Sequence, residues 1–420
     1  MDNPGRAGIV RVMRYDADVI VTGGGLNGPA LALALARAGL TVIVIDAQPA
    51  TARAEADFDG RAYALAIASK RLLEAVGVWD RVAENAQPIL EIKTSDGRPG
   101  EGPSRFFLHF ESAEIEEGPM GFMVEDRHLY AAFLAVMQAE PRITHLSATT
   151  VTAQEAGAAG IAVTLSDGRR LAGRVLAGCD GRQSGTAERA GIRRTGWGYG
   201  QTALVCAVAH ERPHGGIAHQ FFMPSGPLAI LPLKGNRSSI VWSERDETAA
   251  VIANLSDAEF LELLRPRFGD FLGQIALAGK RFSYPLNLTL ANAYVAPRVV
   301  LVGDAAHGVH PIAGQGLNLG FRDVGALAEV LVEAQRRGED IGAADVLERY
   351  QSWRRFDATL LALGMDAVNR LFSNDNPALR AARDLGLGLV GVLPALRRGF
   401  IRQAAGIAGA PPKLLRGRAL

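Results

Sequence analysis

The chain has 420 residues, of which 48% are hydrophobic and 21% are charged, and its formal net charge is +1. These values are those of a globular protein of two or three domains, and without a basic excess we do not expect nucleic acid as a partner. Cys179 and Cys206 belong to no metal-ligand or disulfide pattern, so we expect no metal site and a reducing, cytoplasmic compartment. Residues 1–6 lead into no apolar segment of the kind found in secretory signals.

The first element predicted along the chain is a nucleotide-binding unit. An apolar strand over residues 18–22 runs into a turn that matches G-x-G-x-x-G over residues 23–28, and an Ala- and Leu-rich helix follows over residues 30–38. A second apolar strand over residues 41–45 ends at Asp46, which completes the strand–turn–helix–strand context that the motif requires. The unit therefore predicts a bound dinucleotide.

Each part of this unit has a physical task. The glycines permit a tight turn, close approach of a pyrophosphate and packing of the helix on the strand, while free N–H groups at the helix start bind the anion. Asp46 is placed to accept hydrogen bonds from adenosine ribose hydroxyls, which favours FAD or NAD over NADP. The residues predicted to bind the cofactor here are Gly23, Gly25, Leu26, Asn27, Gly28 and Asp46.

A second match to the motif, over residues 386–391, is interpreted as a coincidence. It follows Arg383-Asp384-Leu385 instead of a strand, and too few residues remain after it for a βαβ unit.

A second cofactor-binding turn is predicted far along the chain. An apolar strand over residues 298–302 leads to an acidic residue, Asp304, which can accept hydrogen bonds from ribityl hydroxyls. The glycine-rich turn over residues 314–318 opens a helix with apolar residues at helical spacing, and its backbone donors would stabilise negative charge on the N1–C2=O edge of a reduced flavin. The residues predicted here are Gly303, Asp304, Pro311, Gly314, Gln315, Gly316, Leu317 and Asn318, with Pro311 and the turn at Gly314 shaping the flavin face.

The string GDAAHGVHPIAGQGLNLGFRD over residues 303–323 resembles the flavin-binding signature of the class A FAD-dependent aromatic hydroxylases. It is most similar to the ubiquinone-biosynthesis hydroxylases, the group of 2-polyprenyl-6-methoxyphenol hydroxylase. The resemblance implies an α/β fold, with a Rossmann-like FAD-binding domain, an inserted, mainly antiparallel β-sheet substrate domain as in p-hydroxybenzoate hydroxylase, and C-terminal helices.

Three further segments are similar to those of this family. The segment 59–65 implies that Arg61 lies near the flavin, and the segment 124–129 implies that Arg127 lies near the FAD phosphates. The middle motif, Asp-Gly-x-x-Ser-x-x-Arg, is matched at Asp180 and Ser184, but Ala187 stands where the arginine belongs and Arg189 follows it. This departure leaves the electron donor open between NAD(P)H and a partner reductase.

The predicted organisation follows the same family. The FAD-binding domain is expected over residues 15–90, 120–195 and 295–340, the substrate domain over 91–119 and 196–294, and a helical region over 341–420. Short strands are predicted at 203–208, 218–223, 228–233 and 239–242.

Residues 385–420 carry six basic and no acidic side chains, namely Arg397, Arg398, Arg402, Lys413, Arg416 and Arg418. They predict either a helix lying on the inner membrane surface or a solvated helix packed on the body.

The function implied by the resemblance is hydroxylation of a polyprenylated phenol in ubiquinone biosynthesis, with O2 as cosubstrate. A C4a-hydroperoxide formed on reduced FAD would transfer oxygen to the ring. A base that polarises the phenol would help, and His219, Tyr199 and Tyr284 are the candidates, none of them preferred. A ubiquinone-biosynthesis complex is a further expected partner.

Two alternatives share the FAD fold, namely a reductase of a prenyl lipid and a non-catalytic FAD-bound subunit of a quinone-synthesis complex. A flavin halogenase would need W-x-W-x-I-P, which residues 241–244 do not match, and a Baeyer–Villiger oxygenase would need a second genuine Rossmann unit. The hydroxylated ring carbon, the tail length and the oligomeric state stay open.

Overall fold

The computed structural model describes residues 14–50, 52, 58–98, 100, 102–114, 118–310, 314–372 and 394–420. A largely parallel sheet carries the nucleotide-binding unit, with the strand order β18-β19-β11-β1-β2-β8 and β9 and β10 attached to β11. Its strands are β1 (Ala17–Thr22), β2 (Val42–Ile45), β8 (Ile143–Leu146), β9 (Val151–Ala156), β10 (Ile161–Leu165), β11 (Arg170–Gly178), β18 (Val295–Ala296) and β19 (Val299–Leu301).

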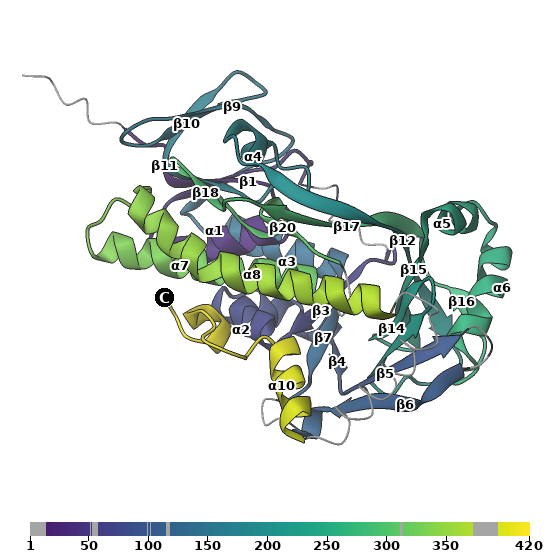
Figure 1. The fold of residues 1–420 in the computed structure, drawn as a ribbon. Coiled ribbons are helices and arrows are strands. Elements are labelled where there is room, and N and C mark those ends of the chain that lie inside the picture. Colours follow the sequence, from purple (N-terminus) through teal and green to yellow (C-terminus); the bar gives the residue numbers. More distant parts are fainter. Residues whose placement is uncertain are drawn as a thin grey trace, which may run out of the picture.

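The central strands of this sheet are buried on both faces, which is why they are continuous apolar runs. On one face lie α1 (Asn27–Arg37), α3 (Asp126–Ala139) and α7 (Gln315–Arg336), whereas β9 and β10 lie on the other (Figure 1). The strand β1 pairs in parallel with β2 on one side and with β11 on the other. Connections therefore run to both sides of β1, and the strand order changes direction at its carboxyl end. Open α/β sheets bind their ligands at such a point.

A second, mainly antiparallel sheet has the strand order β20-β17-β12-β15-β14-β13-β5-β6, with β16 paired to β12. Its strands are β5 (Glu91–Arg98), β6 (Gly102–Glu111), β12 (Arg194–His210), β13 (Ile217–Met223), β14 (Gly226–Leu233), β15 (Arg237–Arg245), β16 (Ile275–Leu277), β17 (Phe282–Ala291) and β20 (His307–Gly308). The four predicted strands are present as β12 to β15, each longer than its apolar core suggested.

The helices α5 (Asp246–Ala253) and α6 (Asp257–Phe268) cover one face of this second sheet. A capping box formed by Ser256 and Glu259 begins α6. The opposite face is turned towards the FAD-binding part, since Ala207, Ala218 and Leu233 belong to the core that surrounds α1 and α7.

Two features of the fold were not predicted. The strands β3 (Ala62–Ala66), β4 (Gln87–Ile89) and β7 (Gly121–Glu125) form a separate three-stranded sheet, next to α2 (Ile67–Ala75). The strand β20 lies in the segment expected to belong to the FAD-binding domain, yet it pairs with β17 of the antiparallel sheet. Both depend on which segments pair in the folded chain, and neither has an apolar alternation strong enough to predict the pairing.

The C-terminal region contains α8 (Ala344–Phe372), which runs beside α7, then α10 (Pro394–Ala404) and the 3-10 turn η6 (Lys413–Arg416) (Figure 1). Ile401, Leu414 and Leu415 are buried in the main core. The described part of the tail is therefore packed on the body. In the described part of the chain, no helix combines the length and the apolar character needed to cross a bilayer. The second G-x-G-x-x-G match, at 386–391, lies outside the described residues.

Candidate functional site: two turns that fit FAD

The glycine turn after β1 is sterically closed to other residues. Gly23 has φ +102°, and a Cβ atom there would lie 2.3 Å from the Cys179 carbonyl oxygen. A Cβ atom at Gly28 would lie 1.9 Å from the Gly23 carbonyl oxygen, so α1 can pack this closely only with glycine. Gly25 lies half-buried in the same turn.

The start of α1 has the chemistry of an anion site. Its N-cap, Leu26, makes no side-chain cap bond, and no acidic residue lies in the first turn. The N–H groups of that turn and the helix dipole are therefore available to a pyrophosphate.

Asp46 is pressed against this turn. Its side chain is buried, Oδ1 accepts a hydrogen bond of 3.1 Å from the Gln48 amide, and Oδ2 would lie 2.2 Å from a Cβ atom at Gly24. Only glycine at position 24 leaves room for the carboxylate, which is fixed at the carboxyl end of β2, beside the glycine turn.

Asn27 joins this turn to the second predicted one. Its Nδ2 atom would lie 2.2 Å from a Cβ atom at Gly303 and 2.5 Å from one at Gly320. Its Oδ1 atom is buried without a hydrogen-bond partner. Two motifs that are 276 positions apart in the sequence thus share one side chain, and the cradle between them fits both ends of FAD.

A buried network holds the second turn. Gly303 has φ +62°, and its amide donates to Asp323 Oδ2 at 3.0 Å. The same carboxylate contacts His307 Nε2 at 2.5 Å and Arg354 Nε at 2.8 Å. Burial raises the pKa of Asp323, but His307 and Arg354 outweigh it and hold that pKa below its ordinary value. The charged carboxylate therefore keeps the turn at Gly303 in place.

Asp304 meets a residue that was not predicted for the site. Arg182 Nε donates to Asp304 Oδ2 at 3.1 Å, and the same guanidinium contacts the Val309 carbonyl oxygen at 3.3 Å. The guanidinium therefore lies beside the carboxylate predicted to bind the ribityl chain. Its position two residues after Asp180, inside a matched motif, was the available signal.

The carboxylate of Asp180 is used by the protein itself. It accepts from Ser184 Oγ at 2.5 Å and from the Thr186 amide and hydroxyl at 2.9 and 2.8 Å. These bonds fix the start of α4 (Gly185–Arg189). Ala187 is fully buried, so the family's arginine has no open position here, and Arg189 donates to Gln154 Oε1 instead.

The predicted arginines Arg61 and Arg127 are both ion-paired. Arg61 lies 2.6 Å from Asp59 and 3.6 Å from Asp126. Arg127 lies 2.8 Å from Glu125, a buried carboxylate that also binds Arg237 at 2.8 Å. Each positive charge is thus balanced within the protein and oriented by its partner.

The N-terminus of α7, like that of α1, has no side-chain cap. Gly314, its N-cap, has φ +63° and makes no side-chain cap bond. The side chain of Asn318 accepts from the Ala66 amide (2.9 Å) and Ser69 Oγ (2.7 Å), and donates to the carbonyl oxygens of Ala64 (2.9 Å) and Gly314 (3.0 Å). Asn318 therefore positions the turn with its side chain, which leaves the backbone groups of the turn for the predicted flavin edge. Pro311 lies outside the described residues.

The candidate bases lie in different surroundings. His219 points to the face covered by α6, with its ring centroid 4.6 Å from that of Phe271 and 5.8 Å from that of Phe221. This position, across the sheet from the FAD-binding part, is wrong for a base. Tyr284 is 43% exposed and stacks on Phe282, which itself carries Arg61 over its ring. Tyr199 alone lies beside the flavin signature, in edge contact with His310.

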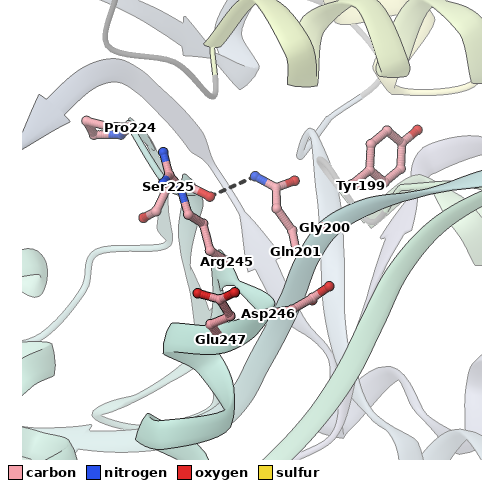
Figure 2. Close-up of a pocket in the computed structure, with 8 residues that line it drawn as sticks. All are labelled: Tyr199, Gly200, Gln201, Pro224, Ser225, Arg245, Asp246 and Glu247. Carbon is pink, nitrogen blue, oxygen red and sulfur yellow. Dashed lines mark hydrogen bonds between the residues drawn. The ribbon is translucent and has the colours of Figure 1, made fainter.

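A cavity of about 440 Å3 opens next to Tyr199, where β12 is irregular between Gly198 and Gln201. Gln201 Nε2 crosses it to donate to the Ser225 carbonyl oxygen at 2.7 Å, as Figure 2 shows. Asn369 of α8 donates to Gln201 Oε1 at 3.0 Å from the other side. The cavity is lined by Tyr199, Gly200, Gln201, Pro224, Ser225, Arg245, Asp246 and Glu247.

The fold is that of a known class of flavoprotein. The p-nitrophenol 4-monooxygenase PnpA from Pseudomonas putida is similar over 94% of this chain and 99% of its own, with a TM-score of 0.78 and 20% identity. PqsL from Pseudomonas aeruginosa covers 88% of this chain and 99% of its own, with a TM-score of 0.73 and 25% identity. The parallel sheet, the antiparallel sheet and the C-terminal helices together define an FAD-dependent monooxygenase of the p-hydroxybenzoate hydroxylase fold, as predicted.

Sequence relatives narrow the class. A family model described as an FAD binding domain matches residues 16–361. The chain is 47% identical to ubiquinone hydroxylase UbiL of Rhodospirillum rubrum, over 96% of the chain and 93% of that protein. It is 35% identical to the 3-demethoxyubiquinol 3-hydroxylase of Escherichia coli, over 93% of the chain and 98% of that protein. The chain belongs to the FAD-binding monooxygenases, in the family of the ubiquinone hydroxylases.

Proposed function

We propose that this enzyme hydroxylates the aromatic ring of a polyprenylated phenol in ubiquinone biosynthesis. The observation that carries the proposal is the joining of the two predicted FAD-binding turns through Asn27, next to an antiparallel sheet whose other face is covered by α5 and α6. Bound FAD supplies the oxygen-activating chemistry when it is present. The chain contributes Asp46 towards the ribose, the starts of α1 and α7 towards anionic groups, and the antiparallel sheet as a wall that excludes water.

The test is oxygen incorporation. The FAD-loaded protein, a short-chain prenylphenol, 18O2 and an electron source (NADPH or NADH together with an added reductase) should yield a product that carries one labelled oxygen, in step with oxygen uptake. A prenyl-lipid reductase would consume no oxygen and leave the ring unlabelled. A non-catalytic subunit would bind FAD but turn over no substrate with any reductant.

The electron donor is part of this proposal. Because Ala187 is buried where the family's arginine bridges FAD and the nicotinamide donor, we favour delivery by a partner reductase. Anaerobic bleaching of the flavin by NADPH or NADH alone, at a rate faster than turnover, would contradict this and make the enzyme self-sufficient.

We also propose that the enzyme is a cytoplasmic protein that touches the inner membrane surface, where its lipid substrate resides, together with a ubiquinone-biosynthesis complex. Within the tail, Lys413 forms an ion pair of 2.6 Å with Glu333 of α7, so its charge points to the protein body and not to a membrane. The stronger support comes from α8, where Phe356, Leu360 and Leu363 are 76%, 61% and 45% exposed at helical spacing. The same helix contacts a residue that lines the cavity, because Asn369 donates to Gln201.

A further inference from the structure

His310 is a buried histidine without a hydrogen bond. It follows β20, within the second stretch of residues predicted to bind FAD (303–318), and only 1% of its surface is exposed. Neither Nδ1 nor Nε2 has a hydrogen-bond partner. Buried polar atoms are nearly always paired, and an unpaired one lowers stability. An unpaired buried imidazole next to a predicted cofactor turn is therefore a candidate for contact with a ligand.

The neighbour of His310 is Tyr199. It meets the imidazole edge-on, with ring centroids 5.1 Å apart and planes at 75°, and its buried hydroxyl faces the Asp366 carboxylate of α8. Tyr199 belongs to β12 of the antiparallel sheet and lines the cavity described above, apart from the charged residues Arg245, Asp246 and Glu247 at its other end (Figure 2). Two residues 111 positions apart thus meet between the second predicted FAD-binding turn and the antiparallel sheet, and His310 brings two unpaired nitrogens to this contact.

Burial is the main reason that both rings are neutral at neutral pH. Burial lowers the pKa of His310 to about 4, and Arg182 acts in the same direction, whereas Asp366 of α8 opposes it. Burial and the Asp366 carboxylate raise the pKa of the Tyr199 hydroxyl. At neutral pH one nitrogen of His310 is therefore a hydrogen-bond acceptor, and the Tyr199 hydroxyl remains a donor.

We propose that His310 orients the aromatic substrate, with one imidazole nitrogen accepting a hydrogen bond from the phenolic hydroxyl of the ring. The inference rests on the proposed function, because it requires a phenol as the substrate. Tyr199 fixes the plane of the imidazole through the edge contact. The arrangement selects ring hydroxyls over ethers and unsubstituted rings, since only a hydroxyl can satisfy the buried acceptor.

The test compares two ligands on the FAD-loaded enzyme. A short-chain prenylphenol and the same molecule without its hydroxyl are titrated while the flavin spectrum is recorded. The wild type should bind the phenol about tenfold more tightly than the deoxy compound, the factor expected for one such hydrogen bond. H310F and H310L should bind both compounds with the affinity of the weaker one, and H310Q, which retains an acceptor, should recover part of the difference.

A second readout separates this role from a purely structural one. Because H310L removes two unpaired buried polar atoms, the substrate-free holoenzyme should melt at a higher temperature, while the added stabilisation by the phenol should shrink.

Other outcomes overturn the inference. If H310F and H310L both keep the tenfold preference, His310 does not contact the hydroxyl. If they lose FAD affinity while the preference persists, the nitrogen serves the flavin. If the wild type incorporates no labelled oxygen into the phenol, the proposed function is wrong, and the inference about His310 is wrong with it. If labelling is normal but the variants keep the preference for the phenol over the deoxy compound, only the inference about His310 is wrong.

Discussion

Asp323 and Arg354 form a buried ion pair, with Arg354 Nε 2.8 Å from Asp323 Oδ1. The Asp323 side chain has no exposure to solvent. The pair connects α7 to α8, and through the Gly303 amide it reaches the turn that precedes Asp304. The geometry of the cofactor site therefore depends on a helix that has no part in the nucleotide-binding motif.

Removing one partner of this buried pair should lower the free energy of unfolding more than removing a surface charge does. D323N leaves the buried guanidinium of Arg354 with Asp357 as its remaining carboxylate and should lower the free energy of unfolding by about 3 kcal/mol. D345N, which breaks an exposed pair with Arg349 on the same helix, should change it by about 0.5 kcal/mol or less. Urea unfolding of the FAD-loaded proteins measures both, and equal effects would contradict the assigned role.

The same pair predicts a pH dependence. Because the pKa of Asp323 is lower in the folded state than its ordinary value of 3.8, its contribution is present above that value and is lost as the pH falls through the lowered pKa. The wild type should therefore lose stability below about pH 4 more steeply than D323N does. Parallel curves of melting temperature against pH would show that Asp323 does not contribute.

FAD binding should require the close packing of α1 against the first glycine turn. G28A places a methyl group 1.9 Å from the Gly23 carbonyl oxygen, which is backbone and cannot turn aside. We expect at least a hundredfold weaker FAD binding, of the order of 3 kcal/mol. The control G364A adds the same methyl group on α8, where no atom lies within 4 Å, and should leave FAD affinity unchanged. Fluorescence titration of the apoprotein with FAD distinguishes the two.

Restoring the family's arginine should not restore direct use of NADPH. Because Ala187 is fully buried, A187R would place an unpaired charge in the core and should destabilise the fold by about 3 kcal/mol or more. The control R189Q, which removes the nearby guanidinium, should leave both stability and the rate of flavin reduction unchanged. A stable A187R protein whose flavin is bleached faster by NADPH would show that the position is open to the nucleotide.

Membrane contact through α8 should depend on its exposed apolar side chains. F356S/L360S should reduce cosedimentation with vesicles of anionic and zwitterionic phospholipid by about tenfold, because two large apolar side chains no longer enter the lipid. V251S, on α5, removes an apolar side chain that is 64% exposed elsewhere on the surface and should have no effect. If R416Q/R418Q alone abolishes binding while F356S/L360S does not, the tail and not α8 makes the contact.

The sequence alone was enough for the fold class and for the two glycine turns that we predict to bind the cofactor. Gly23, Gly28, Gly303 and Gly314 stand where the backbone has a positive φ or meets another backbone closely, and such demands are local, so they leave a readable pattern. Asp46 and Asp304 follow buried strands, and the ends of parallel strands are where ligands bind.

Only the tertiary structure decided which groups meet. Segments more than a hundred residues apart meet in the contact of Asn27 with Gly303 and Gly320, in the salt bridge of Arg182 to Asp304 and in the edge contact of Tyr199 with His310. The pairing of β20 with β17 crosses the domain boundary that was predicted at residue 295. The structure likewise removed His219 from the candidate bases, because strand alternation turns it to the α6 face. The periodicity of a sequence reports which side of an element is buried, whereas the partner on that side is set by packing between elements, which no local pattern encodes.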